Sequence, residues 1–121
     1  MSLQLLMGVG LLGGVGSLAR FLVDGAVSER LGRRFPAGTL VVNLSGALLL
    51  GVLVGAALTP DALRLAGTGL LGAYTTFSTW VFESHRLGED GQARVGAANV
   101  LVSLTLGLAV AWLGRELGGL L

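Results

Sequence analysis

Long apolar stretches alternate with short polar ones along the chain, and this pattern predicts four membrane-spanning helices. A helix needs about 20 predominantly apolar residues to cross the hydrocarbon core of a bilayer. The stretches that come close to this length are Leu3 to Leu22, Leu40 to Leu58, Leu65 to Phe82 and Val95 to Leu113. We therefore expect an all-α membrane protein in which residues 1–121 form a single transmembrane domain.

The polar stretches between these helices predict connections that lie in water or among lipid headgroups. The first, Asp24 to Pro36, and the third, roughly Glu83 to Arg94, collect charges of both signs. The second is a tight turn at Thr59 to Asp61, because Pro60 biases the residue before it away from a helix. Connections this short join the helices as an up-and-down series.

The composition agrees with this prediction and leaves little room for other classes of function. Apolar residues make up 53% of the chain and charged residues 12%, far from the average of soluble proteins. The net charge of +1 provides no basic stripe, so we expect no nucleic-acid partner. The chain has no cysteine, and its single His85 has no nucleophile or metal ligand at a readable spacing. Transport or scaffolding is therefore expected, and an enzyme is not.

Small residues recur four positions apart within three of the predicted helices, which places each pair on one helix face. The pairs are Gly10 and Gly14, Gly51 and Gly55, and Ser103 and Gly107. In lipid, small residues allow helix backbones to approach closely. The spacing predicts close packing within the chain, and a dimer contact through at least one of these faces is an equally open alternative.

Polar side chains inside a span are costly unless they have partners, so they point to candidate functional residues. Asn43 lies near the start of the second span, and its amide offers both donors and an acceptor. In the fourth span Asn99 and Ser103 begin a stripe with a four-residue period that continues through Gly107 and Ala111. Both sets suit helix packing as well as the lining of a narrow polar track, and the residues alone leave the two alternatives open.

The stretch from Gly72 to Trp80 predicts a break near the middle of the third helix. Glycine and several hydroxyl residues weaken the helix, and we expect an unwound turn near Gly72 to Thr76. Non-helical backbone at membrane depth persists only where protein, water or an ion satisfies its carbonyls. A hard cation such as sodium, which prefers oxygen ligands, is one such partner.

An aromatic pair follows this break. Phe77 and Trp80 are three residues apart and therefore share a helix face. The edges of aromatic rings carry partial positive charge, which favours an anion without binding it as tightly as a full cation. The alternative is that the two rings only fill a core.

Three motifs of this chain resemble those of the Fluc (CrcB) family of fluoride channels. In the order and rough spacing of that family they are Gly13 to Phe21, Gly38 to Gly46 and Gly72 to Trp80. The resemblance spans most of the chain, and the third motif is its most specific part. It implies passive conduction of fluoride out of the cell, which reduces fluoride toxicity. It also implies that two copies form an antiparallel dimer with two pores. The expected location is the cell inner membrane or plasma membrane, which the chain crosses several times.

The resemblance also implies roles for individual residues in the pore. Asn43 would donate a hydrogen bond to the permeating fluoride. Phe77 and Trp80 would form an aromatic box, with the hydroxyls of Ser78 and Thr79 nearby. In the fourth helix, the candidate pore residues Asn99 and Ser103 match by spacing and not by a sharp motif.

Two further sites are implied in the same way. The backbone carbonyls of Gly72 and Thr75 from each subunit would hold a structural sodium ion at the dimer interface. Arg20 would stand at a watery pore mouth, whereas without the resemblance it would be interpreted as an arginine that reaches to the lipid interface.

The chain departs from the family at one position, because the family usually has phenylalanine where this sequence has Trp80. Either the pore accommodates the larger ring, with its edge or its N–H meeting fluoride, or the chain supplies one good pore within a mixed dimer. Both a homodimer and a heterodimer with a sister chain are therefore open.

Two other classes of function compete with a channel. A small proton-coupled multidrug exporter with four helices needs a carboxylate within the membrane, but the seven acidic residues all fall in the predicted loops or at helix ends. A membrane scaffold subunit without transport is compatible with the composition.

The distribution of arginine adds an expectation about orientation. The first and third loops carry Arg30, Arg33, Arg34, Arg86 and Arg94, whereas the second loop and the C-terminal tail carry Arg64 and Arg115. The positive-inside rule favours a cytoplasmic location for the first group, while the antiparallel dimer requires both orientations.

Overall fold

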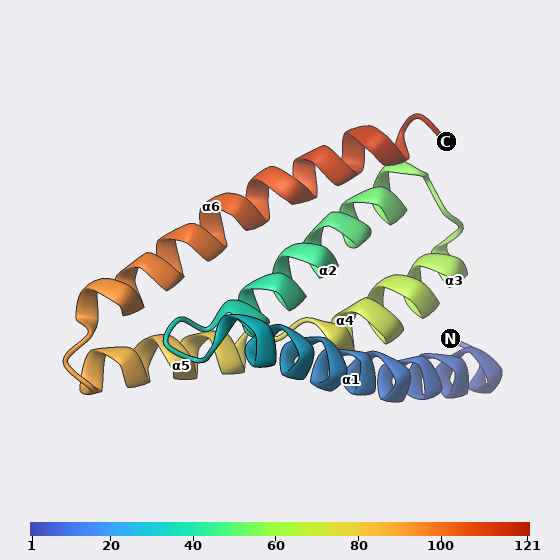
Figure 1. The fold of residues 1–121 in the computed structure, drawn as a ribbon. Coiled ribbons are helices and arrows are strands. Elements are labelled where there is room, and N and C mark those ends of the chain that lie inside the picture. Colours follow the sequence, from blue (N-terminus) through green and yellow to red (C-terminus); the bar gives the residue numbers. More distant parts are fainter.

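The computed structural model describes residues 1–121 as helices joined by short connections (Figure 1). Three helices are long and apolar enough to cross a membrane: α1 (Leu3–Leu31), α2 (Ala37–Gly55) and α6 (Ala93–Gly118). Between α2 and α6 the chain forms a broken segment of four pieces, which are α3 (Pro60–Leu63), the π-helix η1 (Arg64–Leu71), α4 (Gly72–Tyr74) and α5 (Ser78–Glu89). The predicted all-helical architecture, with a break in the third segment, is confirmed.

The predicted end of the first helix at Leu22 was wrong. α1 continues to Leu31 and stops at Gly32, which has a φ of 77°. No proline interrupts this stretch, and the hydroxyl of Ser28 donates to the carboxylate of Asp24 one turn earlier, at 3.4 Å. Charged residues therefore mark where the helix leaves the apolar layer and not where it ends.

The predicted third loop was wrong for the same reason. α5 continues to Glu89 and α6 begins at Ala93, so only three residues separate them. His85 lies 2.7 Å from Glu89, and such pairs four residues apart stabilise an exposed helix end.

The second helix is shifted toward the N-terminus relative to the predicted Leu40 to Leu58. It begins at Ala37, directly after Pro36, and ends at Gly55. Ala57 then adopts a positive φ of 53°. The side chain of Thr59 accepts the backbone N–H of Ala62 and caps the next helix, so the predicted turn is confirmed here.

The helices form two arms in an open arrangement (Figure 1). α2 packs along α6, while α1 packs against η1 and α4, and α5 contacts the beginning of α6. The N-terminus, the connection from α2 to α3 and the C-terminus lie at one end, and the other two connections lie at the opposite end. The predicted up-and-down order is thus confirmed.

Glycine permits the close approach of α2 and α6. A Cβ atom on Gly51 would overlap the carbonyl of Ala111, and one on Gly114 would overlap the carbonyl of Leu48. By contrast, a Cβ atom on Gly10 or Gly107 would meet no atom within 4 Å. The predicted packing within the chain is therefore confirmed for the pair on α2, while no other segment of this chain packs closely against Gly10 or Gly107.

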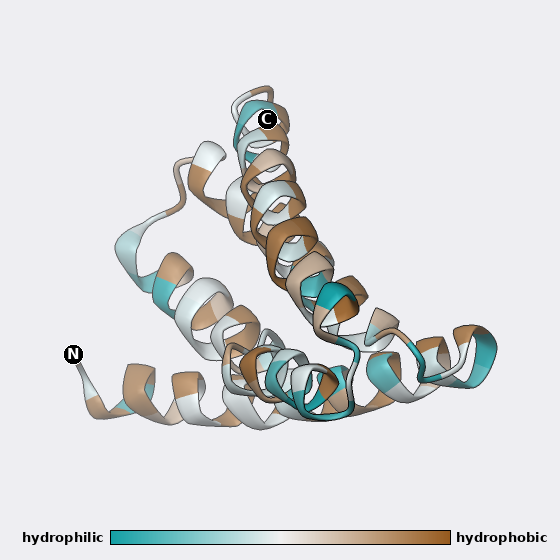
Figure 2. Ribbon diagram, turned by 90° about the vertical axis from the view of Figure 1, so that its left-hand side faces the viewer, coloured by the Kyte–Doolittle hydropathy of each residue, from teal (hydrophilic) through white to brown (hydrophobic).

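The chain buries very few large apolar side chains. Among the large apolar residues only Val42 and Leu71 are buried, and many leucine and valine side chains lie exposed on the helix surfaces. Hydrophilic residues gather at the helix ends and connections, as Figure 2 shows. Such a surface is suited to contact with lipid or with another subunit rather than with water.

Candidate functional site

The break in the third segment covers the residues between α4 and α5. Thr75 is extended, with a ψ of 161°, and its hydroxyl donates to the carbonyl of Leu71 at 3.0 Å. The hydroxyl of Thr76 accepts the backbone N–H of Thr79 at 3.2 Å, as the side chain at a helix N-terminus does. Threonine side chains therefore close both sides of the break, which lies at the C-terminal end of the predicted region.

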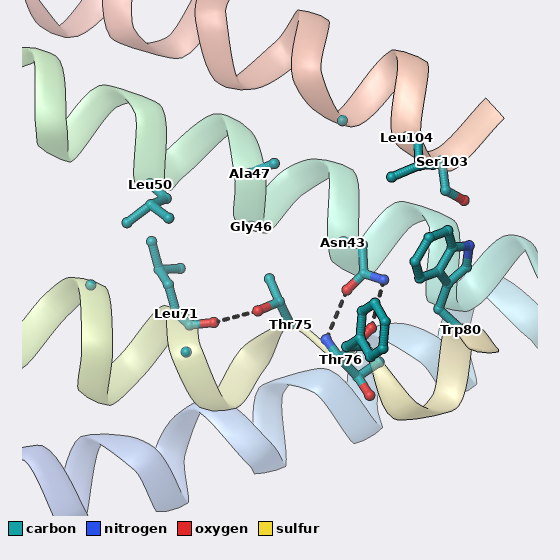
Figure 3. Close-up of a pocket in the computed structure, with 14 residues that line it drawn as sticks. Asn43, Gly46, Ala47, Leu50, Leu71, Thr75, Thr76, Trp80, Ser103 and Leu104 are labelled. Carbon is teal, nitrogen blue, oxygen red and sulfur yellow. Dashed lines mark hydrogen bonds between the residues drawn. The ribbon is translucent and has the colours of Figure 1, made fainter. Parts of the chain in front are cut away.

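Asn43 of α2 holds the break in place through two hydrogen bonds (Figure 3). Its Oδ1 accepts the backbone N–H of Thr76 at 2.8 Å, and its Nδ2 donates to the carbonyl of Thr76 at 2.9 Å. The amide thereby satisfies both backbone groups of a residue that no helix satisfies. The second hydrogen of Nδ2 has no partner in the chain, so Asn43 makes the interhelical contact and retains one free donor.

The break also leaves backbone carbonyls without their helical partners. The N–H of Thr76, which would bind the carbonyl of Gly72 in a continuous α-helix, goes to Asn43 instead. The carbonyl of Thr75 accepts only from Nη1 of Arg20, at a long distance of 3.4 Å. Both carbonyls belong to residues that line one groove, and carbonyl oxygens are suitable ligands for a hard cation.

This groove, with a volume of ≈ 350 Å³, lies between α2, α6 and the broken segment (Figure 3). It brings together six of the residues predicted from sequence: Asn43, Gly72, Thr75, Phe77, Trp80 and Ser103. The side chain of Phe77 is 73% exposed there. Its ring meets that of Trp80 edge to face, with centroids 5.5 Å apart and an angle of 70°, so the predicted shared face is present.

Two further hollows adjoin the groove and reach the charged end of the molecule. The inner hollow, of ≈ 220 Å³, includes Arg20, Thr39 and Thr79, and it shares Thr76 with the groove. The outer hollow, of ≈ 430 Å³, shares Asp24 and Thr79 with the inner one. Its lining also includes three arginines, Arg33, Arg34 and Arg86, together with Glu83 and Asp90. Arg20 thus turns into the molecule and not toward the lipid interface.

The sequence prediction omitted a polar contact between the inner and outer hollows. The hydroxyl of Thr39 donates to Oε1 of Glu83 at 2.6 Å and joins α2 to α5. The spacing in the sequence indicated this contact. Thr39 lies one turn before Asn43, so the two share a face of α2. Thr76, Thr79 and Glu83 are three and four residues apart, so they gather on one side of the facing segment.

Two predicted residues lie away from these hollows. Ser78 is exposed and lines none of the three. Asn99 is only 1% exposed and donates from Nδ2 to the hydroxyl of Ser84 at 2.9 Å. Its backbone carbonyl accepts the indole N–H of Trp80 at 3.3 Å. Asn99 therefore belongs to a polar cluster between α5 and α6.

Comparison with known proteins identifies the family to which the chain belongs. The family model described as CrcB-like protein, Camphor Resistance (CrcB), matches residues 7–115. The chain belongs to the CrcB family. Since it also has three helices able to cross a bilayer, it is a multi-pass membrane protein.

Relatives in this family match the chain over nearly its whole length. It is 60% identical over 114 residues to a protein of Mycolicibacterium paratuberculosis named fluoride-specific ion channel FluC 2, covering 94% of this chain and 93% of the relative. It is 61% identical over 109 residues to a protein of the same name from Mycobacterium tuberculosis strain H37Rv, covering 90% and 86%. A protein of Symbiobacterium thermophilum named fluoride-specific ion channel FluC 1 is 43% identical over 116 residues, covering 91% and 94%.

Proposed function

We propose that this CrcB chain forms a fluoride-selective ion channel and is not an enzyme. The observation that carries the proposal is the identity of 60% over 114 residues to a relative named as a fluoride-specific channel. The residues that resemble the channel motifs lie around a single break and its adjoining hollows, which provides a physical basis for transport.

The three hollows suggest a path for the anion. The outer hollow holds three arginines and three carboxylates. Arg86 is paired with Asp90, so the other two arginines, Arg33 and Arg34, are the ones that attract the anion.

The inner hollow then presents Arg20 and the hydroxyls of Thr39 and Thr79. At the groove, the free N–H of Asn43 and the ring edge of Phe77 replace part of its hydration shell. Fluoride is small and strongly hydrated, so a pore needs several such donors, each weak enough to release it.

Passive conduction suits the export of fluoride across a cell inner or plasma membrane. Hydrogen fluoride is a weak acid that crosses lipid uncharged and ionises in a more alkaline cytoplasm. A channel releases the trapped anion, because a membrane potential that is negative inside favours its exit. The chain thereby reduces fluoride toxicity without coupling to protons.

We also propose that two copies associate in antiparallel orientation through the groove. The small buried core and the exposed ring of Phe77 support a partner at this face. An antiparallel pair brings two breaks to the same depth, where the carbonyls of Gly72 and Thr75 from both copies would hold a sodium ion. Such an ion supplies positive charge that offsets the carbonyl dipoles. Each carbonyl oxygen has two lone pairs, so the long bond from Arg20 leaves room for a metal ligand bond.

Transport from liposomes tests the proposal directly. Purified protein is reconstituted into vesicles loaded with potassium fluoride or potassium chloride, and valinomycin is added to relieve the electrical potential. We expect fluoride to leave far faster than chloride, with no requirement for a pH gradient and with no flux from protein-free vesicles. Comparable chloride flux would refute fluoride selectivity, dependence on a proton gradient would refute a channel and favour a coupled exporter, and no flux would favour a scaffold.

A further inference from the structure

Trp80 brings an indole N–H to the groove that lies on the proposed anion path. An indole nitrogen is a donor only, so this single hydrogen has either the anion or a protein acceptor as its partner. The distinction decides what the channel presents to the ion at this position.

The structure pairs the indole with the protein. Nε1 of Trp80 donates to the backbone carbonyl of Asn99 on α6, at 3.3 Å. The side-chain amide of Asn99 donates to the hydroxyl of Ser84 at 2.9 Å, and this hydroxyl donates to the carbonyl of Trp80 at 2.8 Å. The three residues therefore form a closed ring of hydrogen bonds between α5 and α6.

The indole is also in contact with a neighbouring aromatic ring. Phe77 is 73% exposed, and its aromatic contact is the edge-to-face contact with Trp80 at 5.5 Å. In Figure 3 the indole lies beside Ser103 and Leu104 of α6. Phe77 lies directly before α5, where its carbonyl accepts the backbone N–H of Val81 at 3.0 Å, and Trp80 is the aromatic ring that its side chain meets within the chain.

We infer that Trp80 is a positioning residue: its N–H anchors α5 to the carbonyl of Asn99 and is withheld from the anion, and its ring orients Phe77 toward the groove. This inference rests on the proposed channel function. It assigns anion contact at this level to the aromatic ring edges and the amide of Asn43, and it gives the indole N–H of Trp80 an anchoring role that phenylalanine cannot fill.

Nuclear magnetic resonance of the indole N–H tests the first part. The chain has two tryptophans, Trp80 and Trp112, so protein with ¹⁵N-labelled tryptophan in lipid nanodiscs gives two indole signals, which Trp112→Phe assigns. We expect the indole proton of Trp80 to shift at most slightly with sodium fluoride, because the anion contacts the neighbouring ring of Phe77 and not the N–H. A large, saturable downfield shift of this proton with fluoride and not with chloride shows that the N–H binds the anion and overturns the inference.

Replacement of Trp80 by benzothienylalanine tests the second part, because sulfur replaces the N–H and the ring shape is retained. 4-Fluorophenylalanine reports on Phe77, with Phe77→Leu used to assign its signal. We expect the ¹⁹F shift or line width at Phe77 to change. We also expect fluoride flux to fall about threefold, because loss of a typical interhelical hydrogen bond in a membrane, about 0.6 kcal/mol, changes an equilibrium constant by about that factor. Trp80→Phe, which also lacks the donor, should show the same direction of change.

An unchanged Phe77 signal together with unchanged flux overturns the positioning role, and a lowered melting temperature alone indicates that Trp80 is only a packing residue. Neither resonance measurement needs transport. If native protein passes no fluoride in liposomes, the proposed function fails while the anchoring of the indole is still decided by its own signal.

Discussion

Replacement of Asn43 by leucine should both loosen the break and impair conduction. The leucine side chain has a similar volume, but it offers no donor or acceptor to the backbone of Thr76. The N–H and the carbonyl of Thr76 then lose the hydrogen bonds of 2.8 and 2.9 Å that they make now. Thr76 is buried at 9% exposure, so water does not readily replace these bonds.

The size of the effect follows from the number of bonds and from their surroundings. Interhelical hydrogen bonds within membranes contribute about 0.6 kcal/mol on average and at most about 1.7 kcal/mol each. Two such bonds give an expected loss of about 1–3 kcal/mol in the free energy of unfolding. Loss of the remaining amide hydrogen removes a donor from the proposed path, so fluoride flux should fall by more than the folded fraction does.

Thermal unfolding in detergent and fluoride efflux from liposomes measure the two effects separately. Ser45→Ala is a matched control on the same helix, because it removes hydrogen bonds to Val42 and Tyr74 but none to the backbone of the break. We expect a smaller loss of stability there, with flux retained. Native stability in Asn43→Leu would refute the structural role of the amide, and native flux would refute its place on the anion path.

Three further predictions concern packing, the cation and orientation. Gly114→Val should lower the melting temperature strongly, because its side chain would overlap the carbonyl of Leu48, whereas Gly10→Val has open space and should change it little; equal effects would contradict the close packing of α2 on α6. Exchange of sodium for N-methylglucamine during purification should lower the melting temperature, and no change would contradict a structural sodium ion. A single cysteine at Gly119, challenged in cells with an impermeant thiol reagent, should react in about half the copies if the weak arginine bias permits dual insertion, and labelling of all or none would reject it.

Hydrophobic patterning predicted the number and order of the helical segments because the requirement to cross a bilayer fixes their length and polarity. It misplaced helix ends wherever polar residues continue a helix beyond the apolar layer. The stretch from Asp24 to Leu31 is helical although it is charged, since a helix satisfies its own backbone in water as well as in lipid. The first helix ends only at Gly32, where the backbone takes a positive φ.

The break was predictable from its own residues, but the way in which it is held was not. Thr75 and Thr76 indicated a weak helix, whereas the partner of Thr76 lies 33 positions earlier in the chain, on another helix. Similarly, the spacing of Asn99 suggested a groove-lining residue, but the packing of α5 on α6 turns its amide toward Ser84. Contacts between distant segments depend on how the helices rotate about their axes, which the sequence period constrains only loosely.

The two roles of Asn43 indicate that the fold and the proposed ion contact depend on each other. One hydrogen and the oxygen of its amide bind the backbone of Thr76, and this fixes the direction of the hydrogen that remains free. An amide with no such partners would rotate and would hold its donor less rigidly toward an anion. Preorganised donors avoid the free-energy cost of reorientation when an ion arrives. A broken helix, although less stable than a continuous one, therefore supplies the backbone groups that orient the donor in the groove.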